Sequence, residues 1–450
     1  MSAAKPALYE ELTLESNDQE RTVDLKLGTV SVDYYEDIFS PSITAKVRVV
    51  NTGDSISPKD STDSKKTDGA KQSIYNGLPL RGGEVIKLKI GSNSKDNPGL
   101  DFDSDTKKHF RVASIDNVIK TTESETFVLN LFSREALSNE TSRVGCKYPS
   151  SSPISETVKD IIKKYLKSDK IKDKDVEATE NPYGFIGNMR KPFTVITWLA
   201  SKSVPGTAKG KDATAGYLFF QTQDGYVFKS VDTLISSEKF KNPYTYQEVI
   251  QAGKINNDYN IIKYATKRNQ DLIKKLKRGS FCSHRMFLNP LTFEYTPYQE
   301  GLFKSSDYVG KAATLGEKVT LPKVDAESSE TLGDIPSRNI TAILDVGTVE
   351  VGVSTSKNAD PSKTQSQAMM RYGLITTQTL SMTIPSNTNL KAGNVIECKF
   401  PRVDTNKESK EIDQEQSGLY MIKALCHHFD SAGSFTSLEL IKDTFGPQDK

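Results

Sequence analysis

The stretch RGGEVIKLKI at residues 81–90 resembles KAGNVIECKF at residues 391–400, which sets an offset of 310 residues between them. Each begins with a small-residue turn and continues as alternating apolar and polar side chains, the pattern of a β-strand with one buried face. Four positions are identical: Gly83, Val85, Ile86 and Lys89 in the first stretch, and Gly393, Val395, Ile396 and Lys399 in the second. We therefore interpret the two stretches as the same strand of a repeated unit.

The strands that follow keep this register. FRV at 110–112 aligns with YMI at 420–422 at the same offset of 310, and the leucines at 129 and 131 meet those at 438 and 440 after a one-residue deletion. Upstream, SITAKVRVVN at 42–51 resembles the strand that ends in LSMTIPSN. Alternating sequences match one another partly by chance, and this alternative stays open. A register kept over three strands nevertheless favours duplication of one β-barrel module.

The chain divides into three regions by its pattern. Short alternating runs fill residues 1–145, apart from polar stretches at 52–71 and 91–106, which we expect to be surface loops. Residues 146–335 mix helix and strand patterns, and alternating runs return over 336–450. The sequence thus predicts an α+β, β-rich fold in which two duplicated β-barrel domains are joined by an α+β linking region.

Several local signals predict structure in the linking region. Ser152-Pro153 is a helix start before the apolar face at 154–166, and a second short helix at 193–203 carries Trp198, which we expect to anchor a core. Asp224-Gly225 indicates a hairpin between two aromatic strands. RNQDLIKKLKRG predicts a helix that ends at Gly279.

Composition excludes several classes of protein. Lys and Arg number 60 against 58 Asp and Glu, a balance that does not indicate a dedicated binder of nucleic acid or of acidic substrates. We interpret the basic runs KKYLKSDKIKDK (163–174) and KKLKR (274–278) as solvated faces, with contact to DNA or to an acidic partner as the alternative. No apolar run is long enough for a membrane span, and the N-terminus has no targeting pattern, so we expect folding in a cytoplasm.

The residues that could carry chemistry are few. The 4 cysteines include no close CxxC pair and are expected to be reduced. Cys282 and His284 share a strand face, and at most Cys426 and His428 could join them in a metal site, but we interpret all four as packed hairpin residues. No nucleophile elbow, Walker loop or GxGxxG stretch is present. We therefore expect no catalytic residue, no metal and no cofactor.

Four stretches resemble a known family, the baseplate hub proteins of contractile-tailed phages, which includes the late control proteins and has the type VI secretion spike as a relative. Residues 417–446, SGLYMIKALCHHFDSAGSFTSLELIKDTFG, are similar to the closing hairpin of the family, and TIPSNTNLKAGNVIECKFP resembles its penultimate strands. KPFTVITWLASKS and GYLFFQTQDGYVFKS are similar to the helix and aromatic hairpin that link its two barrels. Within the family the resemblance is closest to hub proteins of T-even-like phages, including those of cyanobacteria.

The resemblance implies two tube-protein-like barrels and a structural, non-enzymatic role. It implies a homotrimeric ring in the tail baseplate of the virion, assembled in the host cytoplasm. Its partners would be the tail tube protein, the central spike protein and other baseplate wedge or hub proteins. The ring would adapt the sixfold tube to the threefold spike, and its lumen would pass the tape measure protein and DNA.

Two functions of other classes stay open. The first is a tail-associated peptidoglycan hydrolase on a hub-like scaffold, which would need a catalytic acid in the middle region, for example among Glu294 to Glu300. The second is a carbohydrate-binding β protein, which predicts aromatic side chains exposed on one barrel face.

Overall fold

The computed structural model describes residues 3–52, 73–78, 80–94, 97–149, 151–206, 214–246, 257–268, 270–290, 293–308, 313–317, 321–343, 361–402 and 412–447. The polar loop predicted at 52–71 lies outside the described residues from residue 53 onward, as do residues 95 and 96 of the second loop.

The strands fall into two large sets and several smaller sheets. The first set comprises β1 (Tyr9–Glu15), β2 (Thr22–Asp24), β3 (Thr29–Asp37), β4 (Thr44–Asn51), β5 (Val85–Ile90), β6 (Leu100–Asp101), β7 (Phe110–Lys120) and β8 (Glu125–Ser133). The second set comprises β14 (Tyr244–Tyr246), β15 (Asn260–Ile261), β16 (Lys263–Arg268), β20 (Gln378–Pro385), β21 (Val395–Lys399), β22 (Gly418–Asp430) and β23 (Ser434–Lys442). The smaller sheets use β9 (Lys147–Tyr148), β10 (Ile171–Val176), β11 (Phe185–Ile186), β12 (Tyr217–Thr222), β13 (Gly225–Ser230), β17 (Cys282–Leu288), β18 (Leu302–Lys304) and β19 (Asn339–Ile343).

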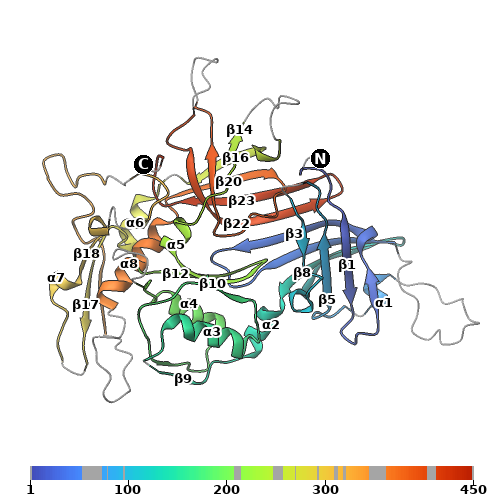
Figure 1. Cartoon of the computed structure of the whole chain (residues 1–450), viewed down its shortest axis with the longest axis horizontal. Helices are drawn as coiled ribbons and strands as arrows, with labels where there is room; N and C mark the ends of the chain where they lie inside the picture. Colours follow the sequence, from blue (N-terminus) through green and yellow to red (C-terminus); the bar gives the residue numbers. More distant parts are fainter. Residues whose placement is uncertain are drawn as a thin grey trace, which may run out of the picture.

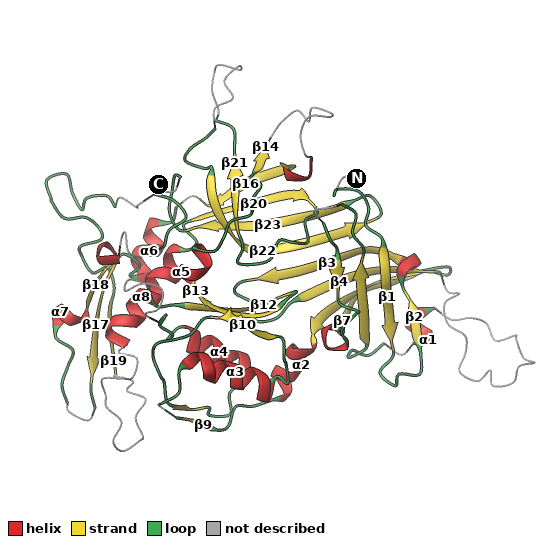
Figure 2. Cartoon of the chain, in the orientation of Figure 1, coloured by secondary structure: helices red, strands yellow, loops and turns green. Residues whose placement is uncertain are grey.

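Between the two sets in the sequence lie the helices α2 (Arg134–Thr141), α3 (Ile154–Tyr165), α4 (Pro192–Ala200) and α5 (Val231–Ile235). Helix α1 (Ile74–Gly77) lies within the first set, and the helices that follow β16 are α6 (Leu272–Arg278), α7 (Tyr298–Gly301) and α8 (Pro361–Leu374). Figure 2 shows α2 to α8 in the left and lower parts of the view and α1 at the right, beside the strands of the first set. The predicted α+β, β-rich class is confirmed.

The two large sets form one continuous 15-stranded sheet. In the first set the order of neighbouring strands is β5-β7-β8-β4-β3, and in the second it is β21-β22-β23-β20-β16. Strand β3 of the first set pairs with β22 of the second, so segments from opposite ends of the chain lie side by side (Figure 1). The junction of β3 and β22 therefore joins the two halves of the molecule.

The first set does not close into a barrel within the described residues, so the predicted β-barrel domains are not confirmed. A barrel closes when the two edge strands of one sheet pair with each other. The edge strand β3 instead pairs with β22 through seven residue pairs, from Asp37 opposite Ala424 to Ser31 opposite Asp430. Since a strand has only two edges and β4 occupies the other, β3 cannot also close its own set.

Corresponding strand pairs in the two sets have the same register. Val85 of β5 lies opposite Arg111 of β7, and Val395 of β21 lies opposite Met421 of β22. Both members of the second pair differ from those of the first by 310 residues, the offset read from the sequence.

Hydrogen bonds repeat at the same offset. The amide of Gly83 donates to the carbonyl of Val112 at 2.8 Å, and the amide of Gly393 donates to the carbonyl of Ile422 at 2.8 Å. A β-bulge follows directly after Val112 in β7 and after Ile422 in β22. The two sets thus share strand order, register and an irregularity.

One hydrophobic core extends under both sets. Alternate residues of each strand point into it, as the period of two requires. The contributors include Val47 and Val49 on β4, Leu129 and Leu131 on β8, Leu380 and Met382 on β20, and Leu438 and Leu440 on β23.

The local predictions for the linking region are confirmed. Helix α3 starts after Pro153, and α6 ends at Gly279 in the left-handed conformation. The hairpin β12–β13 turns at Gly225, whose φ is +131° and where an added Cβ would lie 2.2 Å from the carbonyl oxygen of Lys170. Trp198 of α4 packs edge to face with neighbouring aromatic rings at the border of a second core.

Two features differ from the sequence expectation. The strand expected within ITAILDVGTVEV is β19, which pairs in parallel with β17 of the linking region instead of with the second set. The strand expected at LITTQTLSMTIPS begins only at Gln378, because helix α8 occupies the chain up to Leu374. Figure 1 shows β17 and β18 in a lobe beside α8, away from the large sheet.

A buried ion cluster fixes α8 to the second set. The guanidinium of Arg371 pairs with Asp232 of α5 and, at 3.5 Å, with Asp443 just beyond β23. It also donates to the hydroxyl of Thr214 at 2.9 Å. All three charged side chains are buried, so each depends on the others for compensation.

The substitution Arg371→Met should lower the free energy of unfolding by about 3–5 kcal/mol, because two buried carboxylates lose their cation. Adding Asp443→Asn should recover part of the loss by removing one uncompensated charge. Urea denaturation of both variants measures this, with Arg278→Met on an exposed position as the control. A single variant as stable as the wild type would contradict the assigned role of the cluster.

Candidate functional site

The junction of β3 and β22 is the feature of the structure with the clearest consequence for function. Its seven residue pairs are antiparallel and run without interruption. The outward side chains face solvent, and the inward ones enter the common core. At this junction, one strand set of the chain extends the sheet of the other set edge to edge.

A buried carboxylate lies directly under the junction. Glu36 of β3 is 2% exposed and points to the core side of the sheet. It accepts hydrogen bonds from the hydroxyl of Tyr34 at 2.7 Å, from the amide of Gln223 at 2.7 Å and from the amide of Ala392 at 2.8 Å. Gln223 belongs to the turn of the linking hairpin, and Ala392 to the turn that opens the repeated stretch of the second set. One side chain therefore joins three regions that are far apart in the sequence.

Burial raises the pKa of Glu36 to about 7, although the three hydrogen bonds act in the opposite direction. The sequence contains a signal for this residue. Val32, Tyr34 and Glu36 occupy alternate positions of one strand, so a charged residue stands where an apolar one is expected.

The outward face of the large sheet is polar over β16, β20, β23, β22, β3, β4 and β8. Short polar side chains on this face include Ser381 and Thr383 on β20, Ser437 on β23 and Asn130 on β8. A shallow cavity of about 530 Å³ lies on this face between Tyr35, Lys263 and Glu439. Glu439 at its edge pairs with Lys267 at 3.8 Å and with Lys423 at 2.9 Å, and Lys263 also lines the cavity. The face therefore carries polar groups and charges of both signs, including the exposed Lys46 and Arg48 of β4.

The predicted candidates on β22 are part of this face. His428 hydrogen-bonds Asp33 of β3 at 2.5 Å and Asp430 at 3.0 Å. Burial alone would lower the pKa of His428, but the two carboxylates outweigh it and raise the pKa. Cys426 lies on the same face, and burial raises the pKa of its thiol to about 12. His428 thus reinforces the junction across the two strands.

Cys282 and His284 lie elsewhere, on β17 of the side lobe. Both are buried, and the ring of His284 packs 4.2 Å from that of Tyr298. β17 pairs with β18 and β19, whereas Cys426 and His428 belong to the large sheet. Among the described residues, no group of three or more His, Cys, Asp or Glu side chains is placed to hold a metal ion.

The region named for a catalytic acid is also in the side lobe. Glu294 and Glu300 are exposed. Neither lines the shallow cavity beside Glu439 or the cavity beside Lys391 that is described below. Exposed aromatics gather in the same lobe: Phe293 is 79% exposed and Tyr295 57% exposed. They lie beside β17 and not on the outward face of the large sheet.

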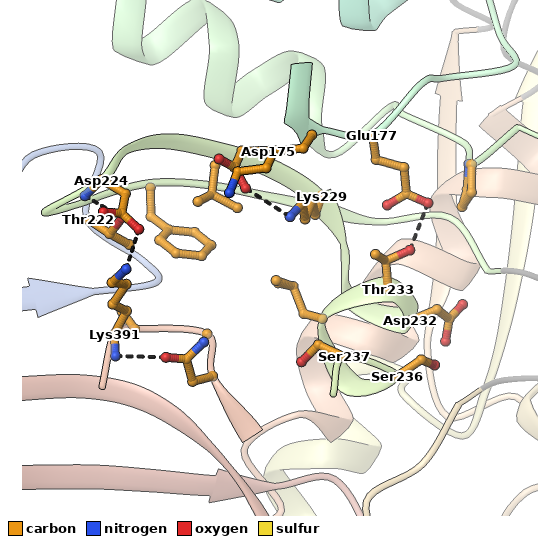
Figure 3. Close-up of a pocket in the computed structure, with 18 residues that line it drawn as sticks. Asp175, Glu177, Thr222, Asp224, Lys229, Asp232, Thr233, Ser236, Ser237 and Lys391 are labelled. Atoms are coloured by element: carbon orange, nitrogen blue, oxygen red, sulfur yellow. Dashed lines mark hydrogen bonds and ion pairs between the residues drawn. The ribbon is translucent and has the colours of Figure 1, made fainter. Parts of the chain in front are cut away.

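A second cavity, of about 480 Å³, separates the linking hairpin from the turn at 391–394 (Figure 3). Two ion pairs lie among its lining residues. Lys391 pairs with Asp224 of the hairpin turn, and Lys229 of β13 lies 3.2 Å from Asp175 of the neighbouring strand β10. The first pair links the hairpin to the second set and so supports the position of Glu36.

The basic runs are only partly solvated faces. Lys163 and Lys164 of α3 and Lys274 and Lys277 of α6 are exposed or nearly so. Lys275 is buried, donates to the hydroxyl of Thr377 at 2.5 Å, and has its pKa lowered to about 8 by burial. The sequence pattern of KKLKR does not distinguish this lysine from its neighbours.

No protein-family model and no curated relative matches the sequence. The fold is similar to solved structures of tail proteins. A 43 kDa tail protein of prophage MuSo2 from Shewanella oneidensis superposes with a TM-score of 0.50 at 10% identity, over 96% of this chain and 98% of that chain. A tail protein from Neisseria meningitidis MC58 gives a TM-score of 0.49 at 11% identity, over 96% of each chain.

A component of the Escherichia coli type VI secretion system, c3393, gives a TM-score of 0.42 at 9% identity, over 97% of this chain and 79% of that chain. That protein is described as structurally similar to the T4 bacteriophage tail proteins gp27 and gp5. The chain therefore shares its fold with the MuSo2 tail protein. No helix among the described residues is both long and apolar enough to cross a membrane.

The raised pKa of Glu36 predicts a specific pH dependence of stability. In the unfolded chain this carboxyl ionises near its usual value of 4.5, whereas in the fold it ionises near 7. The folded state therefore binds the proton more tightly, and the stability that this contributes is present below about pH 4.5 and lost as the pH rises to 7. Relative to Glu36→Gln, the wild type should lose about 3 kcal/mol of unfolding free energy over this range.

Urea denaturation at pH 4.5, 6 and 7.5 measures the difference. Glu123→Gln, at an exposed turn position, is the control for general effects of pH. A constant difference between wild type and Glu36→Gln across the range would show that the carboxyl titrates as in the unfolded chain.

Proposed function

We propose that this chain is a structural subunit of the central hub of a contractile-tail baseplate, and that three copies form a ring. The observation that carries the proposal is the pair of strand sets with a common order and register, joined edge to edge at β3 and β22. The fold of the MuSo2 tail protein supports a role in a tail.

Duplication of the strand set would allow such a ring to join structures of threefold and sixfold symmetry. The shared order β5-β7-β8-β4-β3 and β21-β22-β23-β20-β16 supports descent of both sets from one module. Three chains would then present six similar modules around one axis, so a threefold ring could mate with a sixfold one. We propose that one side of the ring binds the sixfold tube protein and the other binds the threefold spike. Other baseplate wedge or hub proteins would bind around its rim.

The polar outward face of the large sheet fits the wall of a channel for tape measure protein and DNA. A channel that passes a polyanion must avoid strong cationic patches, which would retain phosphates by counterion release. On this face Lys423 and Lys267 are paired with Glu439, and His428 with two aspartates. This pairing reduces the attraction of these groups for phosphate, while Lys46, Arg48 and Lys263 are also exposed on the face. Such a role places the protein in the virion tail.

The proposed ring predicts a mass in solution three times that of the chain, which is 49.8 kDa. Sedimentation equilibrium over a wide range of concentrations measures it, alone and with the spike protein of the same tail. A chain that stays monomeric in both conditions would contradict the ring.

We also propose that the protein is not an enzyme. The competing hydrolase requires a catalytic acid among Glu294 to Glu300, where the described acids are exposed. A zymogram with purified protein on peptidoglycan should show no clearing, whereas lysozyme on the same gel should clear it. Clearing that disappears in Glu294→Gln or Glu300→Gln would support the hydrolase and overturn the structural assignment.

A further inference from the structure

Among the strand edges of the large sheet that have no strand partner within the described residues, two are counterparts of the edges that meet at the junction. Strand β22 uses one edge twice: its first half pairs with β21, and its second half, 424–430, pairs with β3. Strand β7 has the same place in the first set. It pairs with β5 only at Phe110 and Arg111, and no described strand occupies this edge beyond Val112.

The counterpart of β3 is β16. Just as β3 pairs with β4, β16 pairs with β20, and β4 and β20 have the same place beside β8 and β23. The second edge of β3 is covered by β22, whereas no described strand covers the second edge of β16. Within the chain, β22 and β3 thus pair with each other, whereas their counterparts β7 and β16 do not pair with each other.

We propose that β7 of one copy pairs antiparallel with β16 of a second copy, repeating between subunits the β22–β3 junction found within the chain. The inference rests on the proposed ring and names the surfaces that would close it. An open strand edge recruits any compatible strand, and proteins usually cover it or blunt it. The partner of β7 would be a second copy of this chain. That copy supplies β16, which corresponds to β3, the strand that pairs with the counterpart of β7 within the chain.

The exposure of the β7 edge is consistent with a missing partner. In β22, residues 424–430 are buried or half-buried, whereas in β7 residues 116–119 are all exposed. Among these, Ile119 is 64% exposed and Val118 is 36% exposed. Pairing with another strand would cover apolar surface that the single chain leaves in water.

The neighbouring strands assign each junction residue a counterpart, and β7 and β16 each contain one extra residue in this stretch, between Asp116 and Ile119 and between Thr266 and Arg268. Tyr35 lies opposite Cys426 in the junction. The counterpart of Cys426, at offset 310, is Asp116. The counterpart of Tyr35 is Arg268, because Tyr35 pairs with Thr44 and Arg268 with Thr379, the matching positions of β4 and β20. A carboxylate would therefore face a guanidinium where the internal junction has two uncharged side chains.

One turn of the pleat farther, the internal pair is His428 and Asp33. Ile119 takes the place of His428, since the two lie opposite Thr126 and Phe435, which correspond in β8 and β23. Ala265 takes the place of Asp33, since they lie opposite Ser381 and Lys46. An exposed isoleucine would thus meet an alanine, and both contacts in the proposed pairing are complementary.

Cysteine cross-linking tests the pairing. Within one chain, β7 and β16 lie roughly 34 Å apart along the sheet. The strands between them are β8, β4, β3, β22, β23 and β20. This distance is too long for a disulfide to bridge within one chain. Ile119→Cys combined with Ala265→Cys should yield, after mild oxidation, covalent species that end at three chains on a non-reducing gel. Each single variant, and Ile119→Cys combined with Leu27→Cys, should stay uncross-linked.

A charge exchange gives a second readout that does not depend on disulfide geometry. Asp116→Arg should weaken self-association roughly tenfold or more, because like charges then face each other in each contact. Adding Arg268→Asp should restore association. Recovery in the double variant distinguishes a contact between subunits from damage to the bonds that Asp116 accepts from Asn130 and Ser114 within β7–β8.

The outcomes separate this inference from the proposed function. A wild-type trimer whose cysteine pair does not cross-link and whose charge exchange does not recover would overturn the edge assignment and leave the ring intact. Cross-links that continue beyond three chains would support the edge pairing and overturn the closed ring of three. A strict monomer without cross-links would overturn both.

Discussion

The pairing of β3 with β22 is the constraint on which the rest of the structure depends. Strand edges carry backbone donors and acceptors that must be satisfied, and β3 has no second partner in its own set. By taking its partner from the other end of the chain, it joins two strand sets into one sheet over one core. A closed barrel would have satisfied the same groups but would have separated the two halves of the molecule.

Glu36 shows how the linking region is fastened to this junction. A carboxylate is costly to bury, and it is retained here with three donors, one from its own strand and two from turns of other regions. The hairpin turn and the turn at Ala392 are held at fixed positions under the sheet as a result. Arg371 and its two aspartates do the same for α8 at the opposite end of the second set. Buried polar groups thus specify how the parts meet, while the apolar core provides the bulk of the stability.

The sequence predicts those features that depend on local chemistry or on comparison of the chain with itself. Pro153, Gly225 and Gly279 mark a helix start, a hairpin turn and a helix end, because each of these requires particular residue types. The offset of 310 residues anticipates the pairings of Val85 and Val395, since the strand register follows the hydrophobic pattern. What the sequence does not predict is which edges meet. Alternation defines the two faces of a strand and says nothing of its neighbours, so the pairing of β19 with β17 and the open sheet were missed.

The candidate site is less predictable than the fold for a related reason. The residues singled out for possible chemistry, Cys282, His284, Cys426 and His428, lie in two different sheets, and sequence distance carries no information on this. Lys275 is an ordinary charged residue in the sequence and only its burial distinguishes it, whereas the sequence marks Glu36 by its place in the apolar alternation of β3. The proposed structural role needs few residues with diagnostic chemistry, so we expect it to depend on strand edges, sheet faces and symmetry.

The most direct measurement is a density map of the purified protein assembled at high concentration, viewed along the axis of the assembly. We expect three chains whose six modules form one continuous ring of strands, with β7 of each chain beside β16 of the next and the polar sheet face inward. Isolated chains, or an assembly in which the two strand sets occupy unrelated positions about the axis, would contradict this arrangement.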